Sequence, residues 1–304
     1  MKRIFMALIA AAISFSLHAD ENKTIKIISG ETDPFTILAL APHFCKRENL
    51  NVELTQKPSS VFKIGSGAII VLERGDYDMA AGFLNVSLLA AAKGADIKIA
   101  TGVASGGTAI IAKPGLTSYE SLKGKKIGIS KNSTGELILT EEFENRGMRV
   151  TGDNPDVTYV NMQTDVMPIA FMKGSIDAYM ASYPFSRNMV DSGAGVVVDN
   201  YSQISRMIFS TSKIDPIAEA KFNKCFKDMI MAVNNPKRKT EVELAKKHAE
   251  SLGLKIVLPP SDDLSWKANY LVSEKEIKKG AKHLIETKQV PETFVVPQNF
   301  YKPL

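Results

Sequence analysis

The sequence predicts an α/β protein built as two lobes, and three observations carry the prediction. From residue 24 to residue 198, short apolar segments typical of strands alternate with segments that carry helix-capping residues. That alternation implies mainly parallel sheets with helices on both faces. An apolar stretch at 97–112 contains Gly106-Gly107, which is typical of a crossover strand between lobes. A basic-Gly-x-x-Asp pattern at a helix-to-strand junction occurs at both 74–78 and 173–177, as two lobes built alike would give.

The first third of the chain has clear strand and helix signals. Asp33 followed by Pro34 is a strong helix start, and Pro42 should kink or split the helix that follows. Asn49 can take the left-handed conformation that ends this helix. Residues 82–85 are expected to form a turn. Strands are expected at 24–28, 52–55, 77–81 and 97–103, and helices at 35–48, 68–74 and 86–93.

The rest of the chain continues the alternation and then becomes helical. Ser133 and Glu136 have the spacing of a capping box before a helix at 137–146. The Asp residues of the two repeated patterns, Asp78 and Asp177, are interpreted as strand-edge caps rather than catalytic carboxylates. Strands are expected at 109–112, 127–130, 157–161, 177–181, 196–198 and 206–210, and helices at 165–172, 185–191, 216–234, 240–252 and 274–288.

The strand at 206–210 would return the chain to the first lobe. The expected division is one discontinuous lobe of residues 20–108 and 206–304, which includes the C-terminal helices, and a second lobe of residues 109–205. Before them, Lys2 and Arg3 precede an apolar segment at 4–17 that is shorter than the ~20 residues of a membrane span. With Ala19 before a plausible cleavage point, residues 1–19 are expected to be a signal peptide, and the protein periplasmic.

The charge balance points away from nucleic acid. Cleavage after residue 19 removes two of the 38 basic residues and none of the 33 acidic ones. The remaining charges are nearly balanced and scattered along the chain, so they form no basic patch.

The sulfur-containing residues give two expectations. Cys45 and Cys225 both fall in helical patterns in an exported chain, and either a disulfide or two buried free thiols is compatible with the sequence. Met162, Met167 and Met172 are spaced by five residues and are interpreted as core filler.

The usual signatures of catalysis are missing from the sequence. His43, His248 and His283 lie in separate helical segments without a second ligand at metal spacing. Neither a Gly-x-Ser-x-Gly elbow nor a P-loop motif occurs. No metal, no cofactor and no enzymatic activity are therefore expected.

Two segments resemble a known family. LKGKKIG at 122–128, followed by SKNSTG at 130–135, is similar to the central motif of periplasmic solute-binding proteins of the nitrate, sulfonate, taurine and thiamine-precursor class. HFCKRENLNVEL at 43–54 resembles the end of their first helix, and the two basic-Gly-x-x-Asp patterns also match. The resemblance extends over about 24–289, although Asn49 replaces the usual Gly.

That resemblance implies the type II periplasmic-binding-protein fold, with two doubly wound α/β lobes joined by two crossover strands. It also implies a monomer that captures a small solute in the cleft and delivers it to an ABC permease in the inner membrane. Two alternatives remain at this point. One is an enzyme on the same fold, similar to menaquinone-pathway dehydratases or pyrimidine synthases, and the other is a ligand-sensing domain for a membrane partner. The signal peptide and the missing cysteine-rich run of the pyrimidine synthases weigh against the enzymes.

The binding loops of the family select the candidate ligand-binding residues. Helix N-termini near Ser66, Asn85 and Ser133 suit a sulfonate, phosphate, carboxylate or nitrate. If Glu136 faces the cleft, it instead favours an amine or a pyrimidine-like heterocycle with N–H donors. The sequence leaves both ligand classes open. The candidates are Thr32, Asp33, Phe35, Ser66, Gly67, Phe83, Asn85, Gly107, Thr108, Ser133, Thr134, Glu136, Ser182 and Tyr183.

Overall fold

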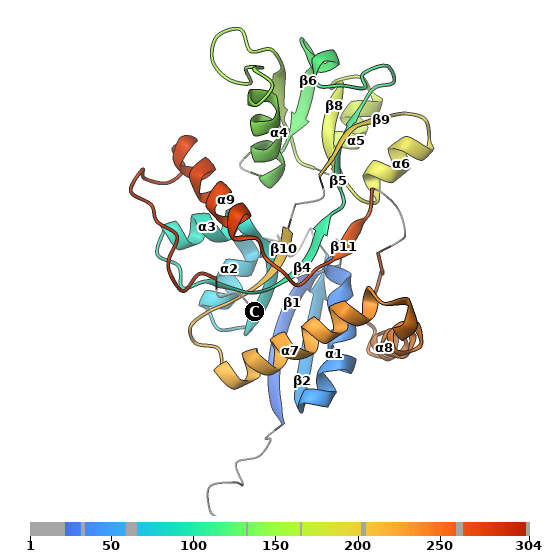
Figure 1. Ribbon diagram of the computed structural model, residues 1–304, viewed down its shortest axis with the longest axis vertical. Coiled ribbons are helices and arrows are strands. Elements are labelled where there is room, and N and C mark those ends of the chain that lie inside the picture. The colour runs from blue at the N-terminus through green and yellow to red at the C-terminus, as the bar shows by residue number, and fades with distance from the viewer. Residues whose placement is uncertain are drawn as a thin grey trace, which may run out of the picture.

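Two β-sheets form the frame of the molecule and lie one above the other along its long axis (Figure 1). This computed structural model describes residues 22–31, 34–58, 66–131, 133–164, 166–201, 205–259 and 264–301. The expected signal peptide at 1–19 lies outside the described residues. Among the residues that are described, none of the helices combines the length and the apolar character needed to cross a membrane.

The lower sheet has six strands in the order β11-β4-β10-β3-β1-β2. β1 pairs in parallel with β2 and β3, whereas β10 pairs antiparallel with β3 and β4, and β11 pairs antiparallel with β4. The strands are β1 (Lys23–Gly30), β2 (Leu50–Lys57), β3 (Met79–Phe83), β4 (Lys98–Gly106), β10 (Ser205–Ser210) and β11 (Trp266–Ala268).

The upper sheet has five strands in the order β7-β6-β8-β5-β9. β6 pairs in parallel with β7 and β8, and β5 pairs antiparallel with β8 and β9. The strands are β5 (Thr108–Ala112), β6 (Lys126–Ile129), β7 (Thr158–Asn161), β8 (Ala178–Ser182) and β9 (Val196–Tyr201).

The expectation of mainly parallel sheets is wrong, because each sheet is parallel only on one side. Parallel neighbours need a crossover connection, usually a helix, between them. β5 instead enters the upper sheet directly from β4 and pairs its first residue, Thr108, with the last residue of β8. β10 enters the lower sheet three residues after β9 and starts beside the end of β3. Both strands therefore run against their neighbours.

Helices cover both faces of each sheet, as predicted. On the lower sheet, one core packs under the segment 35–48, α7 (Pro216–Val233) and α8 (Lys239–Ser251), and the other under α2 (Ser66–Glu73), α3 (Leu84–Ala92) and α9 (Glu274–Glu286). On the upper sheet, α4 (Thr134–Glu144) covers one face, and α5 (Met167–Met172) and α6 (Phe185–Asp191) cover the other (Figure 1). Two short 3₁₀ helices, η3 (Glu120–Leu122) and η4 (Pro236–Arg238), lie in connections.

The repeated basic-Gly-x-x-Asp segments occupy equivalent places in the two sheets. Asp78 accepts a hydrogen bond from the backbone N–H of Lys26 in β1 at 2.7 Å. Asp177 accepts one from the N–H of Lys126 in β6 at 3.0 Å. Each carboxylate thus satisfies a backbone donor of the central parallel strand. The interpretation of both residues as strand-edge caps is confirmed.

The first helix is divided as its proline predicted. It consists of η1 (Phe35–Leu40), α1 (Ala41–Phe44) and η2 (Cys45–Glu48), with Pro42 in the first turn of α1. Asn49 ends it in the left-handed conformation, at φ 48°. The turn expected at 82–85 is wrong, because residues 82 and 83 extend β3 and residues 84 and 85 open α3. The three-residue strand β11 has too little pattern to be predicted.

The two cysteines form a disulfide that joins η2 to α7. The Cα atoms of Cys45 and Cys225 lie 5.0 Å apart, and both residues are buried in the core of the lower sheet. The cysteines are therefore a disulfide and not the two buried free thiols that the sequence also allowed.

Candidate functional site

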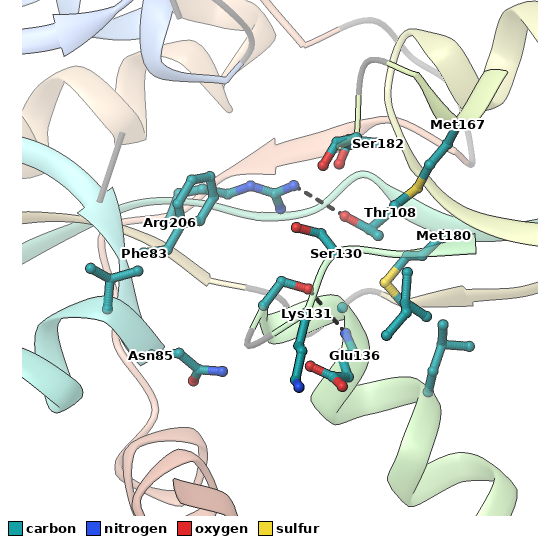
Figure 2. Close-up of a pocket in the computed structure, with 16 residues that line it drawn as sticks. Phe83, Asn85, Thr108, Ser130, Lys131, Glu136, Met167, Met180, Ser182 and Arg206 are labelled. Carbon is teal, nitrogen blue, oxygen red and sulfur yellow. Dashed lines mark hydrogen bonds between the residues drawn. The ribbon is translucent and has the colours of Figure 1, made fainter. Parts of the chain in front are cut away.

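A cavity of about 430 Å³ lies between elements of the two sheets. The lower sheet contributes residues from the end of β3, the start of α3 and β10, and the upper sheet contributes residues from β5, β6, β8, α4 and α5. Figure 2 shows Arg206, Phe83 and Asn85 on one side, Met167 and Met180 on the opposite side, and Thr108, Ser130 and Ser182 between them.

Many of the predicted binding residues line this cavity, although they come from distant parts of the chain. They lie where strands end and helices begin, which is where open α/β sheets hold ligands. The predicted residues that line the cavity are Phe83, Asn85, Thr108, Ser133, Glu136 and Ser182.

Four predicted residues are not among those that line the cavity. Phe35 is buried behind the wall and packs edge-on against Phe83, with ring centroids 5.6 Å apart. Gly107 accepts a hydrogen bond from the N–H of Tyr183 at 2.8 Å, and Tyr183 packs on the lower core. Gly67 lies in the first turn of α2.

The remaining candidates lie partly or wholly outside the described part of the chain. Thr32 and Asp33 are outside it. Ser66 begins α2 and Thr134 begins α4, but the structure describes only the backbone of these two residues.

Gly107 has a structural reason to be glycine. Its φ is +72°, and a Cβ there would stand 2.8 Å from the backbone N of Trp266 in β11. The crossover from β4 to β5 therefore passes too close to β11 for any side chain.

Arg206, the charged centre of the cavity, is not among the predicted residues. This residue is 4% exposed, and its Nη2 donates to Thr108 Oγ1 at 3.1 Å while its Nη1 donates to the carbonyl of Gly106. Burial lowers the pKa of the Arg206 guanidinium to about 10, so it remains protonated at neutral pH. An arginine at the head of an otherwise apolar strand, directly after a crossover, was the available signal.

The apolar wall was also missed. It is formed by four buried side chains of the upper sheet and its helices: Ile129, Leu139, Met167 and Met180. The interpretation of Met167 as core filler is incomplete, because it also lines the cavity. Met172 is 62% exposed, so its interpretation as core filler is wrong.

The helix α4 opens on the cavity with the predicted cap. The Oγ of Ser133 accepts a hydrogen bond from the backbone N–H of Glu136 at 3.1 Å. Glu136 also lines the cavity, close to Lys131 in the view of Figure 2. The cavity therefore has two charged groups at the α4 end in addition to the guanidinium of Arg206.

Asn85 presents a polar group to the cavity from the first turn of α3. The residue is 4% exposed, and among the described residues no donor reaches its Oδ1. Gly280 of α9 packs closely behind it, because a Cβ on Gly280 would lie 3.2 Å from this oxygen. A buried amide oxygen without a partner costs free energy.

The family described as NMT1/THI5 like matches residues 35–250 of this sequence. The chain belongs to this family. The resemblance inferred from the sequence motifs is therefore confirmed, and the match covers most of the described structure.

Solved structures with the same fold include two anion-binding proteins. The periplasmic aliphatic sulphonate binding protein SsuA from Escherichia coli is 17% identical, with a TM-score of 0.66 and coverage of 93% of this chain and 94% of that chain. The periplasmic nitrate-binding protein NrtA from Synechocystis is 12% identical, with a TM-score of 0.66 and coverage of 90% and 83%. The predicted periplasmic-binding-protein fold is confirmed for this NMT1/THI5-like chain.

Curated relatives match only a part of the chain. A Brucella abortus protein named provisionally as a binding protein is 31% identical over 88 residues, which are 29% of this chain. The chain spans about a quarter of the length of the curated relatives it matches, since the matched residues are 26% of that protein.

Proposed function

We propose that this NMT1/THI5-like protein is the periplasmic solute-binding component of an ABC importer and that its solute is a small organic anion. The observation that carries the proposal is the buried guanidinium of Arg206 in the cavity wall. Arginine holds carboxylate, sulfonate and phosphate groups through paired, charge-assisted hydrogen bonds. In a buried site such an attraction is much stronger than in water.

Neutral polar groups support the same assignment of the cavity. Thr108 and Ser182 offer hydroxyl groups, and Asn85 can turn its amide to present either a donor or an acceptor. Protein sites for small molecules commonly combine apolar walls with a few polar groups of this kind. The sulphonate- and nitrate-binding proteins that share the fold are named for small anions.

The proposed role is reversible binding without chemical change. The described residues that line the cavity include no histidine and no cysteine, so these residues form neither a Ser–His nor a Cys–His pair. Binding would close two lobes, residues 20–108 with 206–304 and residues 109–205, around the solute. The closed monomer would then dock on a permease in the inner membrane.

The proposal is tested by isothermal titration calorimetry with nitrate, sulfate, ethanesulfonate, benzenesulfonate and benzoate, and with neutral cytosine and cationic propylamine. We expect one-to-one binding of at least one anion, and no binding of cytosine or propylamine. Binding of only the neutral or cationic compounds would overturn the anion assignment. Mass spectrometry of the recovered anion should show an unaltered compound, and an altered mass would support an enzyme instead.

An ion pair bridges the two sheets beside the cavity. Lys279 on α9, which packs on the lower sheet, pairs with Glu141 on α4 of the upper sheet. Both side chains are about one-third exposed. Because each helix belongs to a different sheet, the pair should favour the closed arrangement that a ligand selects.

Reversing either charge should therefore weaken anion affinity. We expect Lys279→Glu and Glu141→Lys each to weaken it roughly two- to fivefold, the range for a partly exposed pair, and the double charge swap to restore it. Titration calorimetry measures the affinities, and Lys278→Glu, on the exposed side of α9, is the matched control. A double variant as weak as the single variants would contradict this role.

Replacing Glu136 by Gln tests the sign of the ligand charge. The cap bond uses the backbone N–H of Glu136, so the melting temperature should change little. Anion affinity should rise about two- to fivefold, because a negative charge is removed from the cavity wall. Glu144→Gln, at the other end of α4, is the control. A fall in affinity would instead show that Glu136 accepts a hydrogen bond from the ligand.

A further inference from the structure

The apolar side of the cavity contains two thioethers. Met180 in β8 is 9% exposed and Met167 at the start of α5 is 2% exposed, and both line the cavity. In Figure 2 they approach the cavity from the side opposite Arg206. A solute that places an anionic group on Arg206 can therefore extend its remaining atoms toward these side chains.

A glycine backbone packs closely against one of the two methionines. A Cβ on Gly135, in the first turn of α4, would lie 2.8 Å from the Sδ of Met180. The thioether of Met180 therefore packs directly on the main chain of α4, which gives this usually flexible side chain a defined position. Met167 is held by its burial instead, since it is 2% exposed.

An aromatic side chain completes the wall on the Arg206 side. Phe83 lines the cavity and is fixed by the edge-on contact with the buried ring of Phe35, at an interplanar angle of 79°. The space between Phe83 and the two methionines is thus bounded by a ring on one side and by sulfur atoms on the other (Figure 2).

We propose that the solute is an aromatic anion and that Met167 and Met180 select its ring over a saturated hydrocarbon of the same size. The inference rests on the proposed function and narrows its ligand class. A cavity of about 430 Å³ lies within the ~300–1,000 Å³ typical of sites for organic molecules. An inorganic anion would leave most of this apolar wall without contacts.

Sulfur explains why a ring should be preferred to a saturated chain. A saturated hydrocarbon gains from apolar burial alone, and a ring of similar area gains the same amount. A thioether sulfur placed about 5 Å from a ring adds a further attraction, equivalent to roughly two- to tenfold in affinity for each contact. Phe83 can add an edge-to-face contact with the same ring.

Matched ligand pairs separate the two contributions. We would titrate the whole protein with benzenesulfonate against cyclohexanesulfonate, and with benzoate against cyclohexanecarboxylate. We expect the aromatic member of at least one pair to bind fivefold or more tightly. Met180→Leu and Met167→Leu, which keep volume and apolar character, should each lower this ratio toward one without loss of the cyclohexyl compound's affinity.

Met172→Leu is the control, because Met172 lies at the opposite end of α5 from Met167 and is 62% exposed. It should leave the ratio unchanged. A ratio near one in the natural protein, or a ratio that neither leucine variant alters, would overturn the inference and leave anion binding intact. If neither member of either pair binds while cytosine or propylamine does, the proposed function itself fails.

Discussion

Replacing both cysteines by alanine should lower the free energy of unfolding by about 4–5 kcal/mol, as expected when a cross-link between residues far apart in the chain is removed. Cys45 and Cys225 are separated by 180 residues. The bridge also holds η2 against α7 within the aromatic core of Phe44, Phe222 and Phe226. Equilibrium unfolding in urea measures the loss.

The reductant dependence of unfolding provides the control. Dithiothreitol should lower the stability of the natural protein toward that of the double variant and should leave the double variant unchanged. A loss below 1 kcal/mol in the double variant would contradict the prediction, since it would mean that packing alone holds the two helices together.

Replacing Arg206 by Met should weaken anion binding by about 100-fold or more, because the buried guanidinium supplies the charge and at least two hydrogen bonds. Arg206→Lys keeps the charge without the planar fork, so we expect an intermediate loss of about tenfold. Titration with benzenesulfonate and with ethanesulfonate measures both effects.

A folding control is needed, since Arg206 also donates to Gly106 and Thr108. Buried ionic groups can often be replaced by apolar ones of similar volume without loss of stability, and thermal unfolding of the Met variant checks this. Arg74→Met, at a side chain that is 68% exposed and pairs with Asp76, should change neither property. Unchanged affinity in a folded Arg206→Met variant would remove the basis of the proposed anion site.

Local signals were sufficient for much of the framework. Pro42 divided its helix because it has no N–H to donate and clashes with the preceding turn. Ser133 capped α4 because its hydroxyl reaches the N–H of Glu136 within one turn. Asp78 and Asp177 cap strands that lie 52 and 51 residues earlier in the chain, and the signal for both was the motif that occurs twice. Each of these interactions depends on residues close in the chain or on a motif that occurs twice.

The lining of the cavity was anticipated in part. Asn85, Thr108 and Ser182 were selected by the resemblance to the family's binding loops, and the structure brings all three to the cavity because the ends of strands and the starts of helices meet at one edge of a sheet. Met180 was missed because nothing in its own segment distinguishes a side chain that faces a cavity from one that faces a core. Arg206 was missed although a charged residue in an apolar strand was a signal, because its segment does not show what the guanidinium faces. Which face of a strand a residue occupies depends on register with neighbours that are distant in sequence.

The sequence by itself determined the α/β alternation, the caps, the internal repeat and the family, because these follow from short-range hydrogen bonding and from ordered motifs. Only the tertiary structure decided that the sheets are mixed, that Cys45 bonds to Cys225, and that Arg206 faces two methionines across a cavity. These features join residues about 25 to 180 positions apart. Packing of the whole chain brings such residues together, and no local propensity encodes the distance between them.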